Sequence, residues 1–168
     1  RNVIVGFDTR FLSQDYAKAV AGVLAANRIF VVLSDKATPT PTVSFAVKTM
    51  SFDAGVMITA SHNPGQFNGI KIKTSTGAAA PVEITSAVEK LLFKNKIKTL
   101  NFDIAIKSCK IKVSDLTKKY VEFLRKYIDL NRIKNRKFKV LVDVMHGSGN
   151  GFIADVLKGA GVNLIIMR

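Results

Sequence analysis

Short apolar runs alternate with longer amphipathic stretches in the first part of the chain. Three of these runs, residues 1–7, 29–33 and 55–58, have the length and the β-branched content that favour strands. Residues 13–27 and 41–50 lie between them, carry apolar side chains at helical spacing, and predict helices. Strands that alternate with helices favour parallel pairing, with the helices packed on the faces of the sheet. We therefore expect an α/β fold in which a mostly parallel mixed β-sheet is sandwiched by helices.

The apolar pattern becomes less regular after residues 75–81, a segment of small side chains. Residues 82–95 and 114–128 predict amphipathic helices, and the stretch from 100 to 113 predicts mostly extended backbone. The polar and basic residues 131–137 follow the second of these helices. Their composition predicts a domain boundary.

A new set of elements follows this boundary. We expect, in order, a strand at 138–144, a glycine-rich turn at 146–151, a helix at 152–161 and a strand at 162–167. This is the pattern of a first βαβ unit, so we expect residues 1–134 to form one domain and residues 135–168 to begin a second, similar one. The turn does not predict dinucleotide binding, because Phe152 stands where the third glycine of G-x-G-x-x-G is required.

The charge of the chain narrows the class of ligand. The sequence has 26 Lys and Arg residues against 12 Asp and Glu residues, a formal net charge of +14. Such an excess attracts polyanions or phosphorylated small molecules. Between Lys90 and Lys139 the basic residues alternate with apolar ones, which favours solvated faces of helices and strands over a binding surface. No zinc-finger spacing or RNA-binding signature is present, so we do not expect a nucleic-acid partner.

Three further observations bear on location. Cys109 is the only cysteine, which excludes an internal disulfide and a zinc site built from cysteines, and favours the cytoplasm. No apolar run reaches the roughly 18 residues of a membrane span, and the first residues lack a signal-peptide pattern, so we expect no membrane partner. The chain begins with Arg1 rather than Met, and we expect its natural N-terminus to lie further upstream.

The loop at residues 59–68 gathers side chains that can do chemistry. A hydroxyl, an imidazole and an amide stand in consecutive positions, Ser61, His62 and Asn63, between two predicted strands. Ser61 can act as a nucleophile or carry a phosphoryl group, provided that a neighbour handles its proton. His62 and Lys71 are the candidates for that neighbour. Each of these residues alone has an ordinary structural explanation, and their combination favours function.

Five segments together resemble the α-D-phosphohexomutases, the superfamily of phosphoglucomutase and phosphomannomutase. They occur in the order of the family: Gly6-x-Asp8-x-Arg10, Thr38-Pro39-Thr40-Pro41, Thr59-Ala60-Ser61-His62-Asn63-Pro64, Asn68-Gly69-Ile70-Lys71, and Asp143-x-x-His146-Gly147-x-Gly149. The third and fourth segments are highly specific, and the resemblance covers essentially the whole chain. It implies a four-domain enzyme with its active site in a cleft between the domains.

The resemblance also implies roles for individual residues. Ser61 corresponds to the serine that carries the phosphoryl group, gives it to a hexose phosphate, and recovers the other phosphate of the hexose 1,6-bisphosphate. A Mg²⁺ ion takes one oxygen from phospho-Ser61. Lys71 is expected to stabilise the transferring charge or to move the hydroxyl proton, and His62 and Asn63 to orient the loop and contact substrate. Arg10 is expected either to face the substrate or to pair structurally with Asp8.

The sequence departs from the family pattern in what it lacks. The aspartate-rich metal loop, the sugar-recognition loop, the terminal phosphate-binding loop and an arginine-containing segment upstream of the first strand are all absent from these 168 residues. We expect the remaining Mg²⁺ ligands in the missing part of the second domain. We also expect this fragment to have little or no mutase activity by itself.

Three alternatives remain open at this point. The sugar can be glucose, mannose or glucosamine, because the loop that distinguishes them is absent; the motifs lean slightly toward glucose and mannose. A serine hydrolase with Ser61 and His62 fits less well, since adjacent side chains point apart on extended backbone and no G-x-S-x-G elbow is present. A basic nucleic-acid-binding module would rest on net charge alone. The oligomeric state is not readable from the sequence.

Overall fold

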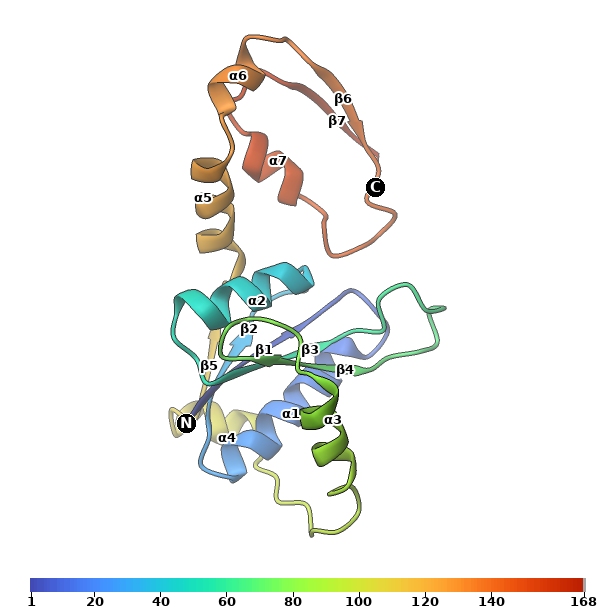
Figure 1. Cartoon of the computed structure of the whole chain (residues 1–168), viewed down its shortest axis with the longest axis vertical. Helices are drawn as coiled ribbons and strands as arrows, with labels where there is room; N and C mark the ends of the chain where they lie inside the picture. Colours follow the sequence, from blue (N-terminus) through green and yellow to red (C-terminus); the bar gives the residue numbers. More distant parts are fainter. Residues whose placement is uncertain (168) are drawn as a thin grey trace. The chain divides into compact units, whose positions relative to one another are not determined.

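The computed structural model describes residues 1–167 (Figure 1). The chain divides into two compact units, Arg1–Leu116 and Thr117–Arg168. Compact units need not coincide with evolutionary domains, so the boundary predicted near residue 134 stays a prediction. None of the helices that residues 1–167 form is long and apolar enough to cross a membrane.

The first unit is built on a five-stranded sheet with the order β4-β3-β1-β2-β5. β1 pairs in parallel with β2 and β3, β2 pairs in parallel with β5, and β4 runs antiparallel to β3. The prediction of a mostly parallel mixed sheet is therefore confirmed. The strands are β1 (Asn2–Phe7), β2 (Phe30–Ser34), β3 (Ala54–Ile58), β4 (Ile70–Thr74) and β5 (Ile111–Ser114).

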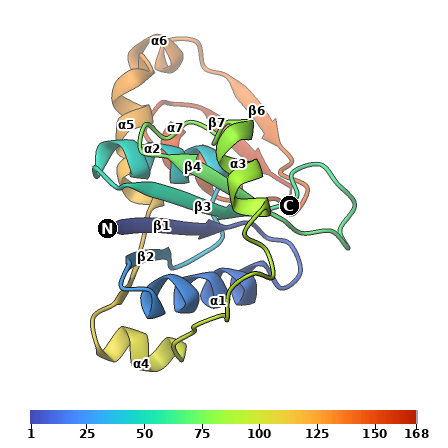
Figure 2. The same ribbon diagram turned by 60° about the horizontal axis from the view of Figure 1, so that its bottom comes forward.

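Helices cover both faces of this sheet. Figure 2 shows α1 (Ser13–Ala26) and α2 (Thr40–Thr49) on opposite sides. Alternate residues of a strand point to opposite faces, so Val3 and Val5 of β1 enter the core under α1, whereas Ile4 enters the core under α2. The sheet is thus sandwiched by helices, as its near-continuous apolar strands predicted.

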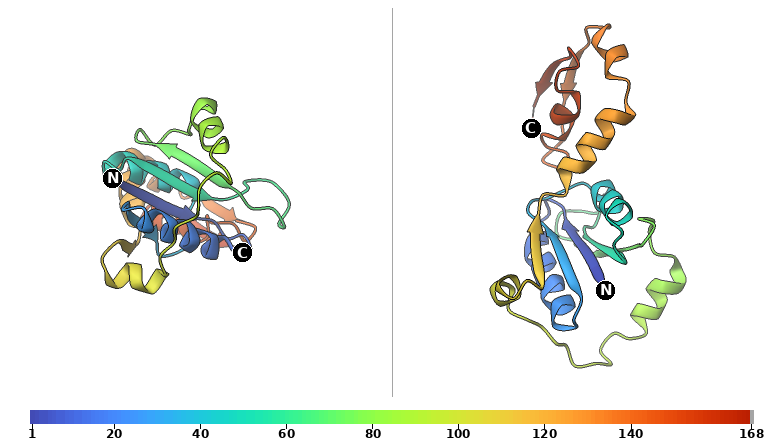
Figure 3. Two further views of the ribbon diagram at one scale, coloured as in Figure 1. Left: turned by 90° about the horizontal axis from the view of Figure 1, so that it is seen from below. Right: turned by 90° about the vertical axis from the view of Figure 1, so that its left-hand side faces the viewer.

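One prediction of extended backbone was wrong. Within the stretch from 100 to 113, Phe102–Lys107 forms helix α4, and only the residues from Ile111 onward are strand. The side chain of Asn101 accepts hydrogen bonds from the backbone N–H groups of Asp103 (3.0 Å) and Ile104 (3.3 Å), which caps the helix. The helix lies beside α1 (Figure 3) and buries Ala105 in the core that α1 shares with the sheet.

Two helix boundaries also differ from the prediction. The helix expected at 82–95 is α3 (Val82–Glu89) and ends earlier, with no buried residue along its length. The helix expected from Ser114 is α5 (Thr117–Tyr127). Ser114 instead completes β5, where it pairs with Ser34 of β2. Strand pairing therefore prevails over the capping preference of this serine.

The second unit contains the βαβ unit predicted from residues 138–167. β6 (Lys139–Val142) and β7 (Asn163–Ile166) pair in parallel, and α7 (Phe152–Leu157) lies between them in sequence. α5 packs on α7, with the rings of Tyr120 and Phe152 at 5.6 Å between centroids. Part of the polar and basic stretch at 131–137 belongs to a short helix, α6 (Leu130–Lys134).

An arginine stabilises the end of α7. Nη1 of Arg125 donates to the carbonyl oxygens of Asp155 (3.1 Å), Val156 (2.8 Å) and Lys158 (2.8 Å). The last carbonyls of a helix have no partner within the helix, and a cation there also complements the helix dipole. Arg125 thus ties α5 to the end of α7.

The antiparallel strand β4 approaches α2 closely at one glycine of β3. A Cβ atom at Gly55 would lie 2.6 Å from Cγ2 of Val47 in α2 and 3.2 Å from Cβ of Lys73 in β4. Only a residue without a side chain fits between these two groups. Lys73 is half-buried, and this burial, together with the positive charge of Lys71 two residues earlier, lowers the pKa of Lys73 below its usual 10.5.

Substitution of Gly55 by alanine is expected to destabilise the first unit by about 1–3 kcal/mol, the usual cost of overpacking a core. Urea unfolding followed by circular dichroism measures this change. The matched control is Gly65→Ala, because a Cβ at Gly65 meets no atom within 4 Å; its effect should stay within about 0.5 kcal/mol. Equal stability of the two variants would contradict the packing described for Gly55.

Substitution of Lys71 by methionine is expected to raise the pKa of Lys73 toward 10.5 without restoring it fully, because burial, the larger cause, remains. A base with a lowered pKa binds fewer protons folded than unfolded. The stability of the protein therefore rises with pH between the folded pKa of Lys73 and 10.5, and this rise should shrink in the variant. An NMR titration of the Lys73 side chain measures the shift, and an unchanged pKa would exclude the contribution of Lys71.

Candidate active site

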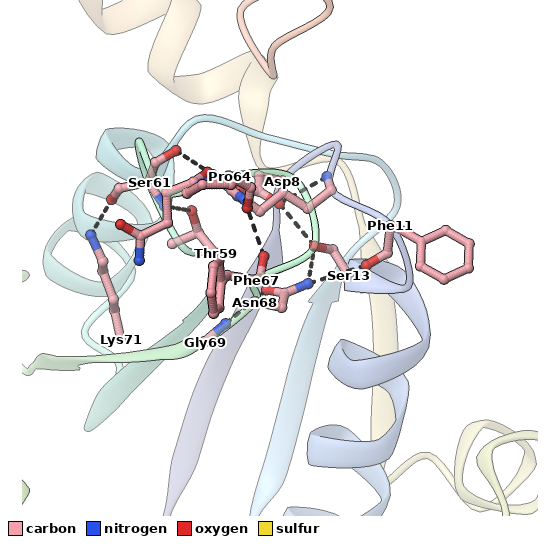
Figure 4. Close-up of polar contacts among 12 residues, drawn as sticks. Asp8, Phe11, Ser13, Thr59, Ser61, Pro64, Phe67, Asn68, Gly69 and Lys71 are labelled. Carbon is pink, nitrogen blue, oxygen red and sulfur yellow. Dashed lines mark hydrogen bonds and ion pairs between the residues drawn. The ribbon is translucent and has the colours of Figure 1, made fainter.

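The site lies at the carboxyl ends of β1 and β3, two neighbouring strands whose connecting helices lie on opposite faces of the sheet. From β1 the chain continues through α1 on one face of the sheet to β2, and from β2 through α2 on the other face to β3, on the far side of β1. In open α/β sheets ligands bind at such a switch point, outside the carboxyl ends of the strands. The loops that follow β1 and β3, residues 8–12 and 59–69, meet at this edge (Figure 4).

Ser61 stands in the loop after β3 with an unusual backbone conformation. Its φ is +55°, in the left-handed region that residues with a side chain seldom adopt. The turn is held locally: the Ser61 N–H donates to Oγ1 of Thr59 (3.0 Å), and the Asn63 N–H donates to the carbonyl of Ala60 (3.0 Å). The residue is exposed to solvent. Strained backbone held by its surroundings is common at functional sites.

Lys71 is the side chain that meets the Ser61 hydroxyl. Its Nζ donates a hydrogen bond to Oγ of Ser61 (Figure 4). β4 pairs antiparallel with β3, and Lys71 lies opposite Met57, one position before the end of β3. This register places Lys71 next to the loop that carries Ser61. The structure thus brings together two of the residues that the sequence analysis selected.

Arg10 lies behind the loop and binds four of its backbone carbonyls. Nη2 donates to the carbonyl oxygens of Ser61 (2.6 Å) and Asn63 (2.6 Å). Nη1 donates to those of Pro64 (3.0 Å) and Phe67 (3.1 Å). The loop from Ser61 to Phe67 is therefore wrapped around one guanidinium group.

Asp8 completes this arrangement and joins it to α1. Its Oδ2 lies 3.5 Å from Nε of Arg10, and its Oδ1 accepts from the Arg10 N–H (3.0 Å) and from Oγ of Ser13 (2.8 Å). Nδ2 of Asn68 donates to the same Ser13 hydroxyl (2.8 Å), while Oδ1 of Asn68 accepts from the Gly69 N–H (2.9 Å). We call residues 59–69 the serine loop. These contacts connect both of its ends to the first turn of α1.

Arg10 and Ser13 both make their contacts within the protein. Arg10 pairs with Asp8, one of the two arrangements expected for it, and its donors all face protein oxygens. A contact with substrate stays a prediction. Ser13 is the first residue of α1; Leu12 occupies the N-cap position with φ of +58°, and the Ser13 hydroxyl donates to Asp8.

His62 and Asn63 are the remaining predicted site residues. Both are exposed next to Ser61, and the contacts that hold Asn63 are made by its backbone N–H and carbonyl groups. Their side chains therefore remain available on the solvent side of the loop. The roles predicted for them in substrate contact stay predictions.

Side chains that bind metals do not gather in the part of the chain that the structure describes. Among residues 1–167 no three His, Cys, Asp or Glu side chains form a group that could hold a metal ion. A phosphoryl group on the exposed Ser61 hydroxyl would offer oxygen atoms of the kind that Mg²⁺ prefers.

Asp8, Ser13 and Asn68 belong to the site but were not predicted as site residues from the sequence. Asp8 and Asn68 lie in the segments Gly6-x-Asp8-x-Arg10 and Asn68-Gly69-Ile70-Lys71, so a signal was available. The sequence alone does not reveal that these two segments meet through the Ser13 hydroxyl.

The sequence and the fold of the chain are similar to those of known proteins. A family model described as phosphoglucomutase/phosphomannomutase, alpha/beta/alpha domain I, matches residues 1–99. A protein of Thermus thermophilus described as a phosphomannomutase has a solved structure with a TM-score of 0.88 and 33% sequence identity, over 99% of this chain and 37% of that one.

Two sequence relatives extend the comparison. A phosphoglucomutase of Staphylococcus saprophyticus is 35% identical over 164 residues, which are 93% of this chain and 29% of the relative. A phosphoglucosamine/phosphogalactosamine mutase of Sulfurisphaera tokodaii is 33% identical over 148 residues, 88% of this chain and 32% of the relative. The chain thus spans about a third of the length of these relatives. It belongs to the phosphoglucomutase/phosphomannomutase family, with the α/β/α domain I of that family at residues 1–99.

Proposed function

We propose that this chain is the serine-bearing part of a phosphohexomutase, which interconverts hexose 1-phosphate and hexose 6-phosphate through a hexose 1,6-bisphosphate. The observation that carries the proposal is the hydrogen bond from Lys71 Nζ to an exposed serine hydroxyl at the carboxyl edge of the sheet. The chain spans about a third of its relatives, so further residues must provide the rest of such an enzyme.

In the first step the phosphoryl group passes from Ser61 to the free hydroxyl of the hexose phosphate. The bond between Ser61 Oγ and phosphorus breaks, and a bond from phosphorus to the sugar oxygen forms. Lys71 is positioned to donate a proton to Oγ through its hydrogen bond, and it takes up in exchange the proton that the sugar hydroxyl releases. In the return step the bond between the other phosphate and its sugar oxygen breaks, the phosphate moves to Oγ, and the Oγ proton passes by way of Lys71 to that sugar oxygen.

The charge around the serine supports phosphoryl transfer. Such a transfer spreads negative charge over the phosphoryl oxygens, so cations near them stabilise the transition state. Lys71 contacts Oγ directly, and Lys73 lies two residues further along β4. His62 and Asn63, exposed beside the serine, are proposed to orient the loop and to contact the substrate.

Mg²⁺ is the cofactor that we propose for the complete enzyme. Phosphorylated Ser61 would contribute one of its ligands, and the metal would neutralise charge on the transferring phosphoryl group. The other ligands must come from residues outside this chain, because the described part offers no cluster of acidic side chains.

Glucose and mannose phosphates are the substrates that we favour, with glucosamine phosphate as the alternative. Relatives of similar identity are named for glucose and for glucosamine or galactosamine, and one solved structure is described as a phosphomannomutase. The cytoplasm, where such sugar phosphates occur, is the location that we propose. An exposed free Cys109 is compatible with its reducing conditions.

The proposal is tested on the complete polypeptide that contains these residues. Peptide mass spectrometry should find one phosphate, on Ser61. Ser61→Ala should lower isomerase activity by roughly 10³-fold or more, because a covalent nucleophile is lost. Ser75→Ala is the matched control, since Ser75 is exposed in the turn after β4 and should leave activity unchanged. Undiminished activity in Ser61→Ala, or a phosphate on another residue, would overturn the mechanism.

Residues 1–168 alone are expected to show little or no mutase activity. The described residues 1–167 hold the serine and its lysine but no set of metal ligands. The loops that bind the sugar and its distal phosphate are expected in the segments that the family pattern places outside them. A coupled assay with glucose 1-phosphate, with and without Mg²⁺, measures this. Turnover comparable to that of a complete phosphoglucomutase would contradict the proposal that residues outside this chain complete the active site.

A further inference from the structure

Four carbonyl oxygens of the serine loop converge on a single side chain. The groups that Arg10 binds come from positions 61, 63, 64 and 67 and are separated in sequence by up to six residues. Carbonyl oxygens carry partial negative charge and repel one another when they point to one place. The loop therefore keeps this shape only while a cation with several donors occupies its centre.

We propose that Arg10 is a positioning residue that acts through the backbone of Ser61. By holding the Ser61 carbonyl it fixes the left-handed conformation of this residue and so aims Oγ at Lys71. This inference rests on the proposed function, because it assigns to Arg10 a share in the rate of phosphoryl transfer and none in substrate binding.

The number of donors in Arg10 supports a positioning role. A guanidinium has five N–H groups in a fixed plane. Four of them are directed at the loop carbonyls, and Nε faces the carboxylate of Asp8 at 3.5 Å. A phosphate of a substrate could bind Arg10 only by displacing these contacts, including two of 2.6 Å to Ser61 and Asn63.

The burial of the ion pair supports the same conclusion. The side chains of Arg10 and Asp8 are only 13% and 14% exposed. Burying a charge costs free energy unless its partners replace the lost water, and here the loop carbonyls, the Ser13 hydroxyl and the Arg10 N–H replace it. Such a network is rigid and leaves the guanidinium little freedom to move toward a ligand.

The network also connects the loop to a rigid element. Asp8 and Asn68 both bind the hydroxyl of Ser13, the first residue of α1. Catalytic groups held by helices and strands are placed more accurately than groups on free loops. Arg10 thus transmits the position of α1 and the sheet to the Ser61 backbone.

The decisive variants are Arg10→Lys and Arg10→Ala. Lysine keeps the charge but has three donors and no plane, so it cannot bind four separated carbonyls. The matched control is Arg125→Lys, because Arg125 also donates to three backbone carbonyls, in the other unit of the chain. It removes a comparable arginine clamp without altering the serine loop.

The first measurement uses the 168-residue chain and does not depend on activity. Amide hydrogen exchange at residues 61–67 should become faster in Arg10→Lys and stay unchanged in Arg125→Lys. The backbone chemical shifts of Ser61 should move away from values typical of positive φ only in the Arg10 variants. Added guanidinium ion should restore both signals in Arg10→Ala, whereas methylammonium should not. Unchanged exchange and unchanged shifts in Arg10→Lys would overturn the proposal.

The second measurement uses the complete polypeptide and separates kcat from KM. Both Arg10 variants should lower kcat by roughly 10²-fold, the size of effect that a misplacement of about 1 Å can produce. The KM for hexose phosphate should change by less than about threefold, because the lost interaction is not made with the substrate. A raised KM with unchanged kcat would identify Arg10 as a substrate-binding residue and refute the positioning role.

The two measurements distinguish failure of this inference from failure of the proposed function. If the unsubstituted polypeptide has no mutase activity but exchange in the loop responds as expected, the function is wrong and the structural role of Arg10 stands. If the unsubstituted polypeptide is active and Arg10→Lys retains its kcat, the function stands and the positioning role is wrong.

Discussion

The guanidinium of Arg10 is the group on which the geometry of the serine loop depends. Secondary structure normally satisfies backbone carbonyls one by one, but here four of them point to a common centre and share one cation. The position of the exposed Ser61 hydroxyl, on the outer side of the loop, therefore depends on the Arg10 guanidinium on its inner side. The strained left-handed conformation of Ser61 persists because Arg10 binds the carbonyl of that residue.

The topology of the sheet explains why these groups meet. The crossover helices α1 and α2 lie on opposite faces, so the carboxyl ends of β1 and β3 are left open beside each other. β1 delivers Asp8 and Arg10 to this opening, and β3 delivers Ser61. The antiparallel return of β4 then brings Lys71 back from the other end of the loop, in a register fixed by its pairing with β3.

Much of this could be predicted from the sequence, and the exceptions have physical reasons. The strands and the first two helices follow from hydrophobic spacing, and the return of Lys71 toward Ser61 follows from a short loop between two strands. The helix at Phe102–Lys107 was missed because its start depends on one cap, Asn101, and its stability on burying Ala105 against α1. The four-carbonyl contact of Arg10 was missed because backbone groups leave no trace in side-chain patterns.

β4 is an edge strand of the sheet, which affects the tendency of the protein to aggregate. Residues 78–80 fold back along β4, where the Ala80 N–H donates to the Ile72 carbonyl, and shield only its later half. Near Ile70 and Lys71 the edge is not covered by residues 78–80. Lysines on an edge strand oppose pairing with strands of other molecules. The ammonium group beside the serine therefore also protects against self-association, so neutral replacements at this position can favour aggregation as well as loss of chemistry.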